Sequence, residues 1–462
     1  MTLIKSISGI RGIIGGRPGN GLTPVDIVKF TAAFGKFITG IENNKKMVVG
    51  RDARISGQMV NNIVIGTLQS IGIDVVDLGL STTPTVEIAV PKERAAGGII
   101  LTASHNPTEW NALKLLNKNG EFINDEEGKQ VLAMAEHLDF DFANVNELGT
   151  LTHDESYLQK HIEEILTLEL VDQQAIAGAN FSVAVDAVNS SGGIFVPALL
   201  KALGVKTIYE LYCDPNGYFP HNPEPLPANL TDLSALVVRE KADFGIAVDP
   251  DVDRLCFVME NGEMFGEEYT LVAVADYILQ NKKGNTVSNL SSTRALKDVT
   301  EKHGGVYHAA AVGEVNVVTK MKEVDAVIGG EGNGGVIYPA THYGRDALAG
   351  IAIFLTHLAK SKKKISVLRN EYPAYFMSKN KIVLTPDLDI DNLLTTMRDK
   401  YKDTPHSTLD GLKIDFENEW VHLRKSNTEP IIRIYAEAPT QVEANALAER
   451  IMAEIQFVVS KK

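Results

Sequence analysis

Short apolar runs alternate with longer segments of helical spacing through most of the chain. Buried strands form continuous apolar runs, whereas an amphipathic helix repeats its apolar positions every three to four residues. In the first part of the chain the predicted strands are 46–50, 75–79 and 97–100, and the predicted helices are 24–37, 56–69 and 84–90. Strands and helices that alternate in this way predict a sheet covered by helices.

The same alternation recurs twice further along the chain. The second set of predicted strands comprises 182–186, 206–212 and 243–248, and the third comprises 286–290, 305–308 and 325–328. In each set one strand is followed by a polar loop, and these loops contain Ser104, Asp251 and Glu331. Ligands bind at the carboxyl ends of strands in open α/β sheets, so these loops are the first candidates for a functional site.

The pattern changes after about residue 371. Strands at 379–384 and 420–424 and a helix at 440–455 predict a small α+β domain. The run Lys362-Lys363-Lys364 indicates a solvated surface, and it places a linker within residues 360–373.

A chain of 462 residues is too long for one hydrophobic core. We therefore expect an α/β protein with three similar mixed-sheet domains and a smaller carboxyl-terminal α+β domain. The expected boundaries are 1–152, 153–255, 256–368 and 369–462.

Composition narrows the class of protein. Hydrophobic residues make up 44% of the chain and charged residues 23%, as in an ordinary globular protein. The formal net charge of −14 argues against binding to a nucleic-acid backbone, but it allows small phosphorylated ligands that need only a local basic site. Two cysteines, Cys213 and Cys256, form no disulfide or metal pattern, and we find no signal peptide or membrane-spanning run. We expect a cytoplasmic protein without nucleic-acid or membrane partners.

The loop Thr102-Ala103-Ser104-His105-Asn106-Pro107 follows the apolar strand 97–100. Pro107 keeps Asn106 out of the helical region, so Ser104 is presented on a stiff turn. His105 and the nearby Lys114 are candidates for proton transfer, and neighbouring cations would lower the pKa of Lys114. An ordinary polar turn, with His105 as a structural hydrogen-bonding residue, is the alternative.

Asp249, Asp251 and Asp253 are spaced by two, so on an extended segment their side chains project to the same side. Three converging carboxylates need a neutralising cation, and oxygen ligands suit Mg2+. A phosphate oxygen on Ser104 could complete the coordination, and Arg254 could add a fixed positive charge. A solvated acidic turn is the alternative.

Three further segments suit a phosphorylated sugar. The glycine-rich segment 8–16 carries Arg11, and glycines let a backbone approach an anion closely. In segment 330–335, Glu331 and Asn333 supply an acceptor and an amide for vicinal hydroxyls. An anion clamp is suggested by Arg424, Ser426, Asn427, Thr428 and Arg433, because arginine binds phosphate bidentately. The alternatives are a flexible amino-terminal loop, a glycine-rich turn and a surface turn with scattered charge.

The chain resembles the α-D-phosphohexomutases, a family that includes phosphoglucomutase, phosphomannomutase and phosphoglucosamine mutase. The segments that carry the resemblance are 102–107, 249–254, 330–335 and 424–430, in the order of the family. The resemblance implies four domains around a central cleft, with one loop from each. It implies that Ser104 is carried as phosphoserine and that Ser104, Asp249, Asp251 and Asp253 bind Mg2+. Glu331 and Asn333 would then contact sugar hydroxyls, and the loop of Arg424 would hold the phosphate that is not transferred.

The resemblance also implies a reaction. Phosphoserine 104 would donate its phosphoryl group to a hexose 1- or 6-phosphate, and the resulting hexose 1,6-bisphosphate, which also serves as activator, would turn over and return its other phosphate. We expect glucosamine phosphate as substrate, because segments 8–12 and 312–315 favour it, although Ser426-Asn427-Thr428 favours the glucose and mannose members. We expect a monomer or homodimer.

The chain departs from the family pattern at several positions. Asn333 and Gly335 stand where a serine and a histidine are common, and Ala311 stands where a lysine or arginine is common. Two other functions therefore stay open: a Mg2+-dependent sugar-phosphate phosphatase, and an inactive sugar-phosphate-binding paralogue.

Overall fold

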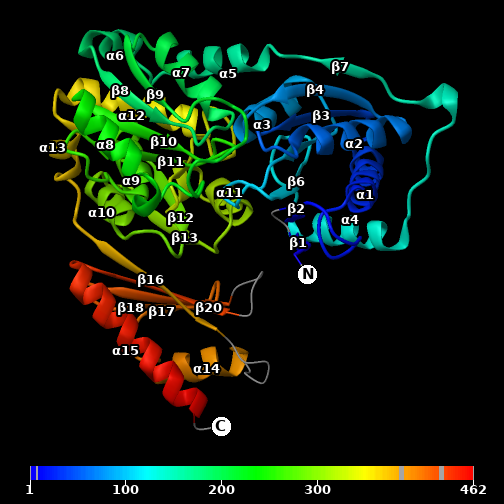
Figure 1. The fold of residues 1–462 in the computed structure, drawn as a ribbon. Coiled ribbons are helices and arrows are strands. Elements are labelled where there is room, and N and C mark those ends of the chain that lie inside the picture. The colour runs from blue at the N-terminus through cyan, green and yellow to red at the C-terminus, as the bar shows by residue number, and fades with distance from the viewer. Residues whose placement is uncertain (1, 7–8, 384–389, 426–430, 461–462) are drawn as a thin grey trace.

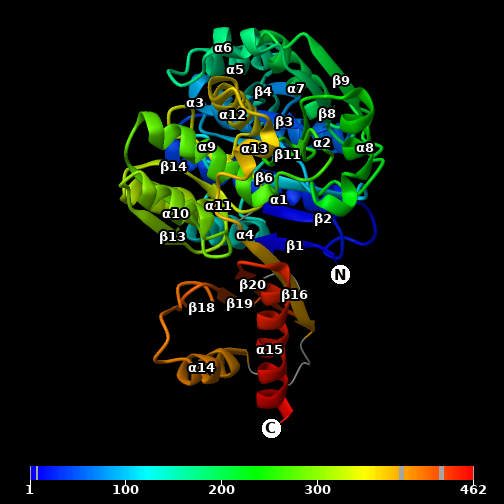
Figure 2. The ribbon, with the colours of Figure 1, turned by 90° about the vertical axis from the view of Figure 1, so that its left-hand side faces the viewer.

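The computed structural model describes residues 2–6, 9–383, 390–425 and 431–460. The chain forms a large main body and a smaller carboxyl-terminal lobe, which lies below the main body in Figure 1 and is also distinct in the perpendicular view of Figure 2. The main body holds three mixed sheets of seven, four and four strands, and the lobe holds a five-stranded antiparallel sheet. The predicted fold class, three α/β units and a smaller α+β unit, is confirmed. Within the described residues, no helix is long and apolar enough to cross a membrane.

The first unit is built on the sheet β1-β2-β6-β5-β3-β4-β7. Its strands are β1 (Ile4–Ser6), β2 (Gly9–Ile13), β3 (Lys46–Arg51), β4 (Asp74–Leu80), β5 (Gly97–Leu101), β6 (Trp110–Leu116) and β7 (Leu151–His153). Its helices are α1 (Pro24–Glu42), α2 (Gly57–Ser70), α3 (Thr83–Lys92) and α4 (Asp125–His137), with a 3-10 turn η1 (Val145–Glu147). A capping box between Thr23 and Asp26 starts α1. Strand β6, which the sequence analysis did not predict, runs antiparallel to β5 and brings Lys114 opposite Ile100.

The second and third units have related sheets, β11-β10-β8-β9 and β13-β12-β14-β15. The second unit comprises α5 (Tyr157–Leu166), α6 (Gln173–Ala179), β8 (Ser182–Asp186), α7 (Gly192–Ala202), β9 (Thr207–Leu211), η2 (Pro227–Asn229), α8 (Thr231–Glu240), β10 (Phe244–Val248) and β11 (Leu255–Met259). The third comprises α9 (Glu267–Asn281), β12 (Asn285–Asn289), α10 (Ala295–Lys302), β13 (Tyr307–Ala310), α11 (Glu314–Glu323), β14 (Ala326–Glu331), β15 (Gly335–Ile337), α12 (Ala347–Ser361) and α13 (Ile365–Arg369). In both units one edge strand is antiparallel to its neighbour.

A single hydrophobic core joins the second and third units. At its centre, Phe354 of α12 stacks on Phe257 of β11 with ring centroids 3.9 Å apart. Helix α13 contributes Ile365 and Leu368 to the same core. Residues 365–368 therefore pack with the main body, within the segment 360–373 in which the sequence analysis expected a linker, and the exposed lysine run 362–364 lies just before them.

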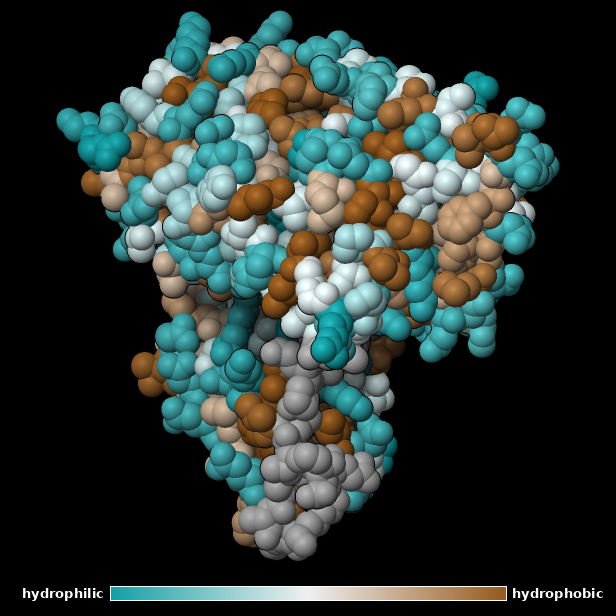
Figure 3. Space-filling view, turned by 45° about the vertical axis from the view of Figure 1, so that its right-hand side comes forward, coloured by the Kyte–Doolittle hydropathy of each residue, from teal (hydrophilic) through white to brown (hydrophobic). Residues whose placement is uncertain are grey.

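The carboxyl-terminal lobe packs two helices on an antiparallel sheet of order β16-β20-β19-β18-β17. Its elements are β16 (Phe376–Val383), α14 (Ile390–Lys400), β17 (His406–Ser407), β18 (Leu412–Asp415), β19 (Trp420–Lys425), β20 (Ile431–Ala438) and α15 (Gln441–Ser460). The helical spacing of Leu447, Ile451 and Ile455 places these side chains in the lobe core, as predicted. Figure 3 shows a recessed, largely hydrophilic region between the main body and the lobe.

The loop after β10 is fixed by neighbours from the other units. The N–H of Thr83, in the first unit, donates to the carbonyl of Asp251 at 2.9 Å, and the N–H of Ala347, in the third, donates to the carbonyl of Val252 at 3.2 Å. The acidic loop of the second unit therefore lies at the interface with the other two units.

Candidate active site

Ser104 lies just beyond the carboxyl end of β5 in an unusual backbone conformation. Its φ is +49°, in the left-handed region that a non-glycine residue adopts only when its surroundings hold it there. Its N–H donates to Oγ1 of Thr102 at 2.9 Å, and the Thr102 hydroxyl donates in turn to Asp52 at 2.7 Å. The turn is therefore stiff, as the sequence analysis expected.

Arg54 binds the main chain of this turn. Its buried guanidinium donates to four main-chain carbonyls of the turn and the start of β6: Ser104 at 2.5 Å, Asn106 at 2.6 Å, Pro107 at 2.6 Å and Trp110 at 3.0 Å. Its Nε pairs with Asp52 at 3.1 Å. The sequence analysis did not select Arg54; the available signal was an Asp52-Ala53-Arg54 triplet directly after a predicted strand.

The three aspartates of the loop after β10 converge on Ser104. The Ser104 hydroxyl donates to Oδ2 of Asp249 at 2.8 Å, although the two residues are 145 positions apart. Asp249, Asp251 and Asp253 are fully buried, and each offers a carboxylate oxygen within 4.8 Å of the others. The other oxygen of Asp249 accepts the N–H groups of Asp253 and Arg254, each at 3.1 Å. The structure thus brings together the residues that the sequence analysis assigned to a metal site.

The carboxylates fit a divalent cation. Oδ1 of Asp251 and Oδ1 of Asp253 are buried and have no hydrogen-bond partner among the described residues. Burial, together with the charges of Asp253 and Asp251, raises the pKa of Asp249 well above its usual range. Unpaired oxygens and mutual repulsion are what an oxygen-liganded cation such as Mg2+ would relieve.

Lys114 faces the same carboxylates from β6. Its Nζ lies 2.6 Å from Oδ2 of Asp251 and 3.3 Å from Oδ2 of Asp253. Burial alone would lower the pKa of Lys114, but the two carboxylates outweigh it and raise this pKa above its usual value. The sequence argument counted the neighbouring cations, whereas the carboxylates in direct contact act in the opposite direction.

His105, Arg254 and Arg11 surround the acidic loop on another side. Nδ1 of His105 lies 3.4 Å from the Ser104 hydroxyl, and burial and then the charges of Arg254 and Arg11 lower the pKa of His105 well below its usual value. Arg254 forms an ion pair with Glu224 at 3.3 Å and lies 4.0 Å from both Asp249 and Asp253. Arg11 is on β2, and burial, followed by Arg254, lowers its pKa. Arg254 and Arg11 thus supply positive charge beside the three carboxylates.

Glu331 is the last residue of β14, and its carboxylate is held from both sides. One oxygen accepts the Asn289 side-chain amide at 2.9 Å and the N–H of Gly313 at 3.1 Å. The other lies 3.3 Å from Arg345, a residue that the sequence analysis missed because a lone arginine in a loop has no local signal. The side-chain carbonyl of Asn333 accepts the N–H of Gly335 at 3.2 Å, so it is engaged by its own loop.

The basic residues of the lobe lie on two neighbouring strands. Arg424 of β19 is directly opposite Arg433 of β20 in the sheet register. The Arg424 side chain donates to Asp410 at 2.7 Å, and the same carboxylate oxygen accepts the N–H of Val312 in the main body at 3.0 Å. Asp410, also missed from the sequence, thus connects Arg424 to the main body. Ser426, Asn427 and Thr428 lie outside the described residues.

Comparison with known proteins assigns the three α/β units and the carboxyl-terminal lobe to one family. The chain matches the phosphoglucomutase/phosphomannomutase models for alpha/beta/alpha domains I, II and III and for the C-terminal domain, over residues 3–142, 156–262, 266–375 and 383–454. The chain belongs to this family of phosphohexomutases, whose members are mutases.

Relatives and solved structures agree with this assignment. The chain is 36% identical over 444 residues to a "Phosphoglucomutase/phosphomannomutase" of Thermococcus kodakarensis, covering 96% of each chain. It is 33% identical over 459 residues to a "Probable phosphoglucosamine mutase" of Methanopyrus kandleri, covering 98% of each. A crystal structure of a phosphoglucomutase/phosphomannomutase family protein from Burkholderia thailandensis superimposes with a TM-score of 0.84 at 26% identity, covering 98% of this chain and 97% of that one.

Proposed function

We propose that this chain interconverts hexose 6-phosphate and hexose 1-phosphate through a phosphoserine at Ser104, with glucosamine phosphate as the preferred substrate. The observation that supports the proposal most directly is the 2.8 Å hydrogen bond from the Ser104 hydroxyl to buried Asp249. This bond places the Ser104 hydroxyl beside the aspartates. A cation bound by these aspartates could therefore also contact a phosphate on Ser104.

The transfer exchanges one P–O bond for another. The bond from Ser104 Oγ to phosphorus breaks, and a bond from phosphorus to the free sugar hydroxyl forms. The hydroxyl proton needs an acceptor, and the uncharged imidazole of His105, 3.4 Å from Ser104 Oγ, is placed beside the transfer. The positively charged Lys114 and Arg254 offset negative charge around the phosphoryl group. In the second half of the cycle, the other phosphate of the hexose 1,6-bisphosphate returns to Ser104.

Asp249, Asp251 and Asp253 would hold Mg2+ together with the phosphoryl group on Ser104. When bound, the cation supplies Lewis-acid stabilisation of the phosphoryl oxygens. Glu331 would accept a hydrogen bond from a sugar hydroxyl, because the lone pairs of its Arg345-facing oxygen are not saturated by one ion pair. Arg424 and Arg433 would bind the phosphate that is not being transferred.

A glucose or mannose phosphate is the second candidate substrate. It is favoured by the 36% identity to the Thermococcus kodakarensis phosphoglucomutase/phosphomannomutase, whereas the 33% identity to the Methanopyrus kandleri relative favours glucosamine phosphate. Coupled assays with the 1-phosphates of glucosamine, glucose and mannose decide between them. Fast turnover of glucose or mannose 1-phosphate with slow turnover of glucosamine 1-phosphate would contradict our choice of substrate.

Ser104→Ala tests the reaction itself. We expect it to remove nearly all mutase activity without changing the melting temperature, and to abolish the uptake of a phosphoryl group from glucose 1,6-bisphosphate, followed by intact mass. Ser234→Ala, in α8 and outside the site, is the matched control. Release of inorganic phosphate in place of the isomerised sugar would indicate a phosphatase. A wild-type chain that takes up no phosphoryl group would indicate a binding paralogue.

A further inference from the structure

Arg345 lies at the point where three separate segments bring carboxylates together. Its Nη2 donates to Asp253 in the loop after β10 at 2.6 Å, and its Nε donates to Glu314 at the start of α11 at 2.7 Å. Its Nη1 lies 3.3 Å from Glu331 at the end of β14. Arg345 is buried, with 8% of its surface exposed, so these interactions are little screened by solvent. A planar guanidinium fork is the side chain that can serve three carboxylates at once.

The contact with Asp253 determines which of its oxygens is available. Oδ2 of Asp253 is occupied by both Arg345 and Lys114, and Oδ1 has no hydrogen-bond partner among the described residues. Without Arg345 the carboxylate could rotate, since χ2 of aspartate is a broad torsion. Arg345, together with Lys114, therefore holds Oδ2 of Asp253 and leaves Oδ1 free of hydrogen bonds among the described residues.

The contact with Glu331 acts in the same way at the other end of the guanidinium. Asn289 and Gly313 engage one oxygen of Glu331, and Arg345 faces the other. The single guanidinium thus fixes the distance and orientation between a carboxylate of the triad and the carboxylate of segment 330–335. The 2.7 Å bond from Nε to Glu314 gives the guanidinium a third anchor, in the same unit as Glu331.

Gly335 makes room for this arrangement. A Cβ added at Gly335 would lie 2.3 Å from Cδ and 3.0 Å from Cγ of Arg345, and 3.1 Å from the side-chain carbonyl of Asn333. These contacts involve the stem of the arginine, so an alanine at 335 would have to displace the guanidinium. The glycine and the arginine are therefore complementary.

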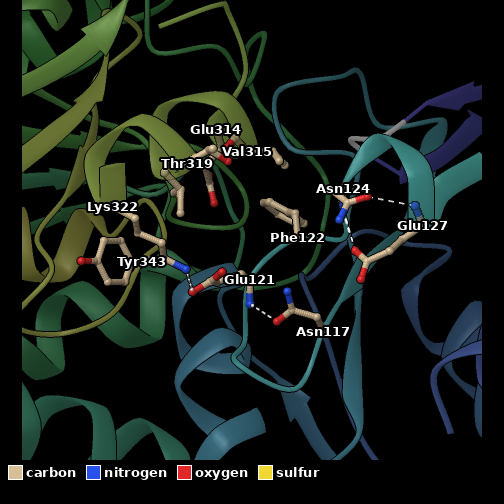
Figure 4. Close-up of a pocket in the computed structure, with 11 residues that line it drawn as sticks. Asn117, Glu121, Phe122, Asn124, Glu127, Glu314, Val315, Thr319, Lys322 and Tyr343 are labelled. Carbon is tan, nitrogen blue, oxygen red and sulfur yellow. Dashed lines mark hydrogen bonds and ion pairs between the residues drawn. The ribbon is translucent and has the colours of Figure 1, made fainter. Parts of the chain in front are cut away.

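Glu314 lines a cavity of about 160 Å³ between the first and third units (Figure 4). In that view Glu314, Val315 and Thr319 of α11 face Phe122 and Asn124 of the first unit. The ion pair between Lys322 and Glu121 closes one side. Glu314 therefore borders open space on one side. On the other side its carboxylate is held by the hydrogen bond from Arg345.

We propose that Arg345 is a positioning residue that couples the metal-binding and sugar-binding parts of the site, with Gly335 as the residue that admits it. The proposal rests on the proposed function, in which Asp253 serves the cation and Glu331 serves the sugar. It predicts that one substitution at a residue that is neither a proposed metal ligand nor a proposed sugar ligand loosens both sites together.

Arg345→Lys is the first test, because it keeps the charge and removes the fork. We expect Mg2+ affinity, measured by calorimetry, to fall about 10-fold to 100-fold, as when an outer partner of a metal ligand is lost. We expect kcat/KM to fall about 100-fold, the effect of roughly 1 Å of misplacement, with KM for the hexose phosphate also raised. Arg369→Lys is the matched control, because Arg369 donates to the Phe265 carbonyl and contacts neither site.

Gly335→Ala is the second test, and it replaces Arg345→Lys in the same measurements if that variant does not fold. It changes no charge. The added methyl group meets Arg345 and Asn333 and none of the three aspartates, so a loss of Mg2+ affinity would come from a displaced Arg345, whereas a raised KM alone could come from Asn333. Arg345→Ala should also recover activity when guanidinium ion is added, which a purely structural role would not allow. Wild-type Mg2+ affinity and KM in both Arg345→Lys and Gly335→Ala would overturn the inference. A wild-type chain that takes up no phosphoryl group from glucose 1,6-bisphosphate would instead overturn the proposed function.

Discussion

Arg54 determines the shape of the turn that presents Ser104, and Arg54→Lys tests this directly. The guanidinium donates to four main-chain carbonyls at 2.5, 2.6, 2.6 and 3.0 Å, and to the Asp52 carboxylate at 3.1 Å. A lysine ammonium keeps the charge but has three hydrogens and no planar fork. At least two of these five acceptors therefore lose their donor.

The expected cost follows from those lost bonds. A hydrogen bond from a charged group contributes about 1.5 to 3 kcal/mol, so two lost bonds cost at least about 3 kcal/mol of unfolding free energy. This is below the total of about 5 to 15 kcal/mol of a folded domain, so the variant should still fold. The strained φ of +49° at Ser104 should relax, and a shift of about 1 Å at the reacting oxygen should lower kcat about 100-fold.

Urea unfolding measures the loss of unfolding free energy. Steady-state assays measure kcat, and the rate of phosphoryl uptake at Ser104, followed by intact mass, measures the transfer step. Arg51→Lys is the matched control, because Arg51 bonds to the Asp52 carbonyl and Gln58 and not to the turn. A variant that loses stability but keeps wild-type kcat would refute the positioning role of Arg54. A variant with wild-type stability would refute the hydrogen-bond argument as a whole.

Two further predictions concern the buried charges. Saturating Mg2+ should raise the melting temperature, by an amount equivalent to about 2.7 kcal/mol when the free ion is 100 times its Kd, because it neutralises the three buried aspartates. Asp251→Asn should weaken this response, whereas Asp186→Asn, a buried carboxylate outside the triad, should keep it; equal responses would contradict the assignment of the cation site. Burial, with a contribution from Glu314, raises the pKa of Glu87 to about 8 from an ordinary 4.5. The folded protein then retains a proton that the unfolded chain releases, so the stability contributed by Glu87 falls as pH rises from about 4.5 to 8. Glu87→Gln stays uncharged, so its melting temperature relative to wild type should be higher at pH 9 than at pH 6, and the same difference at both pH values would contradict the shift.

The sequence alone located most of the parallel strands of the main body, but not strands such as β6. Alternation of apolar runs and helical spacing is a local property, so β3, β5, β8 and β10 fall where the runs predict them. The aspartates of the acidic loop were recognisable for the same reason, since their spacing by two is visible in a few residues. Ser104 and Asp249 follow strands of two different sheets, so their meeting was expected only from the resemblance to a family in which each domain contributes one loop to a central cleft.

Only the tertiary structure decided which side chains support that site. Arg54, Arg345 and Asp410 act through partners from distant segments, and nothing in their immediate neighbours indicates those contacts. The charge state of Lys114 also required the structure, because its pKa depends on the balance between burial and the carboxylates that touch it. Gly335 shows the same limit: its sequence context suggests only a flexible turn, whereas the structure shows the stem of Arg345 in the space that a side chain would fill. Periodicity is set by near neighbours along the chain, while contacts and electrostatics are set by neighbours in space.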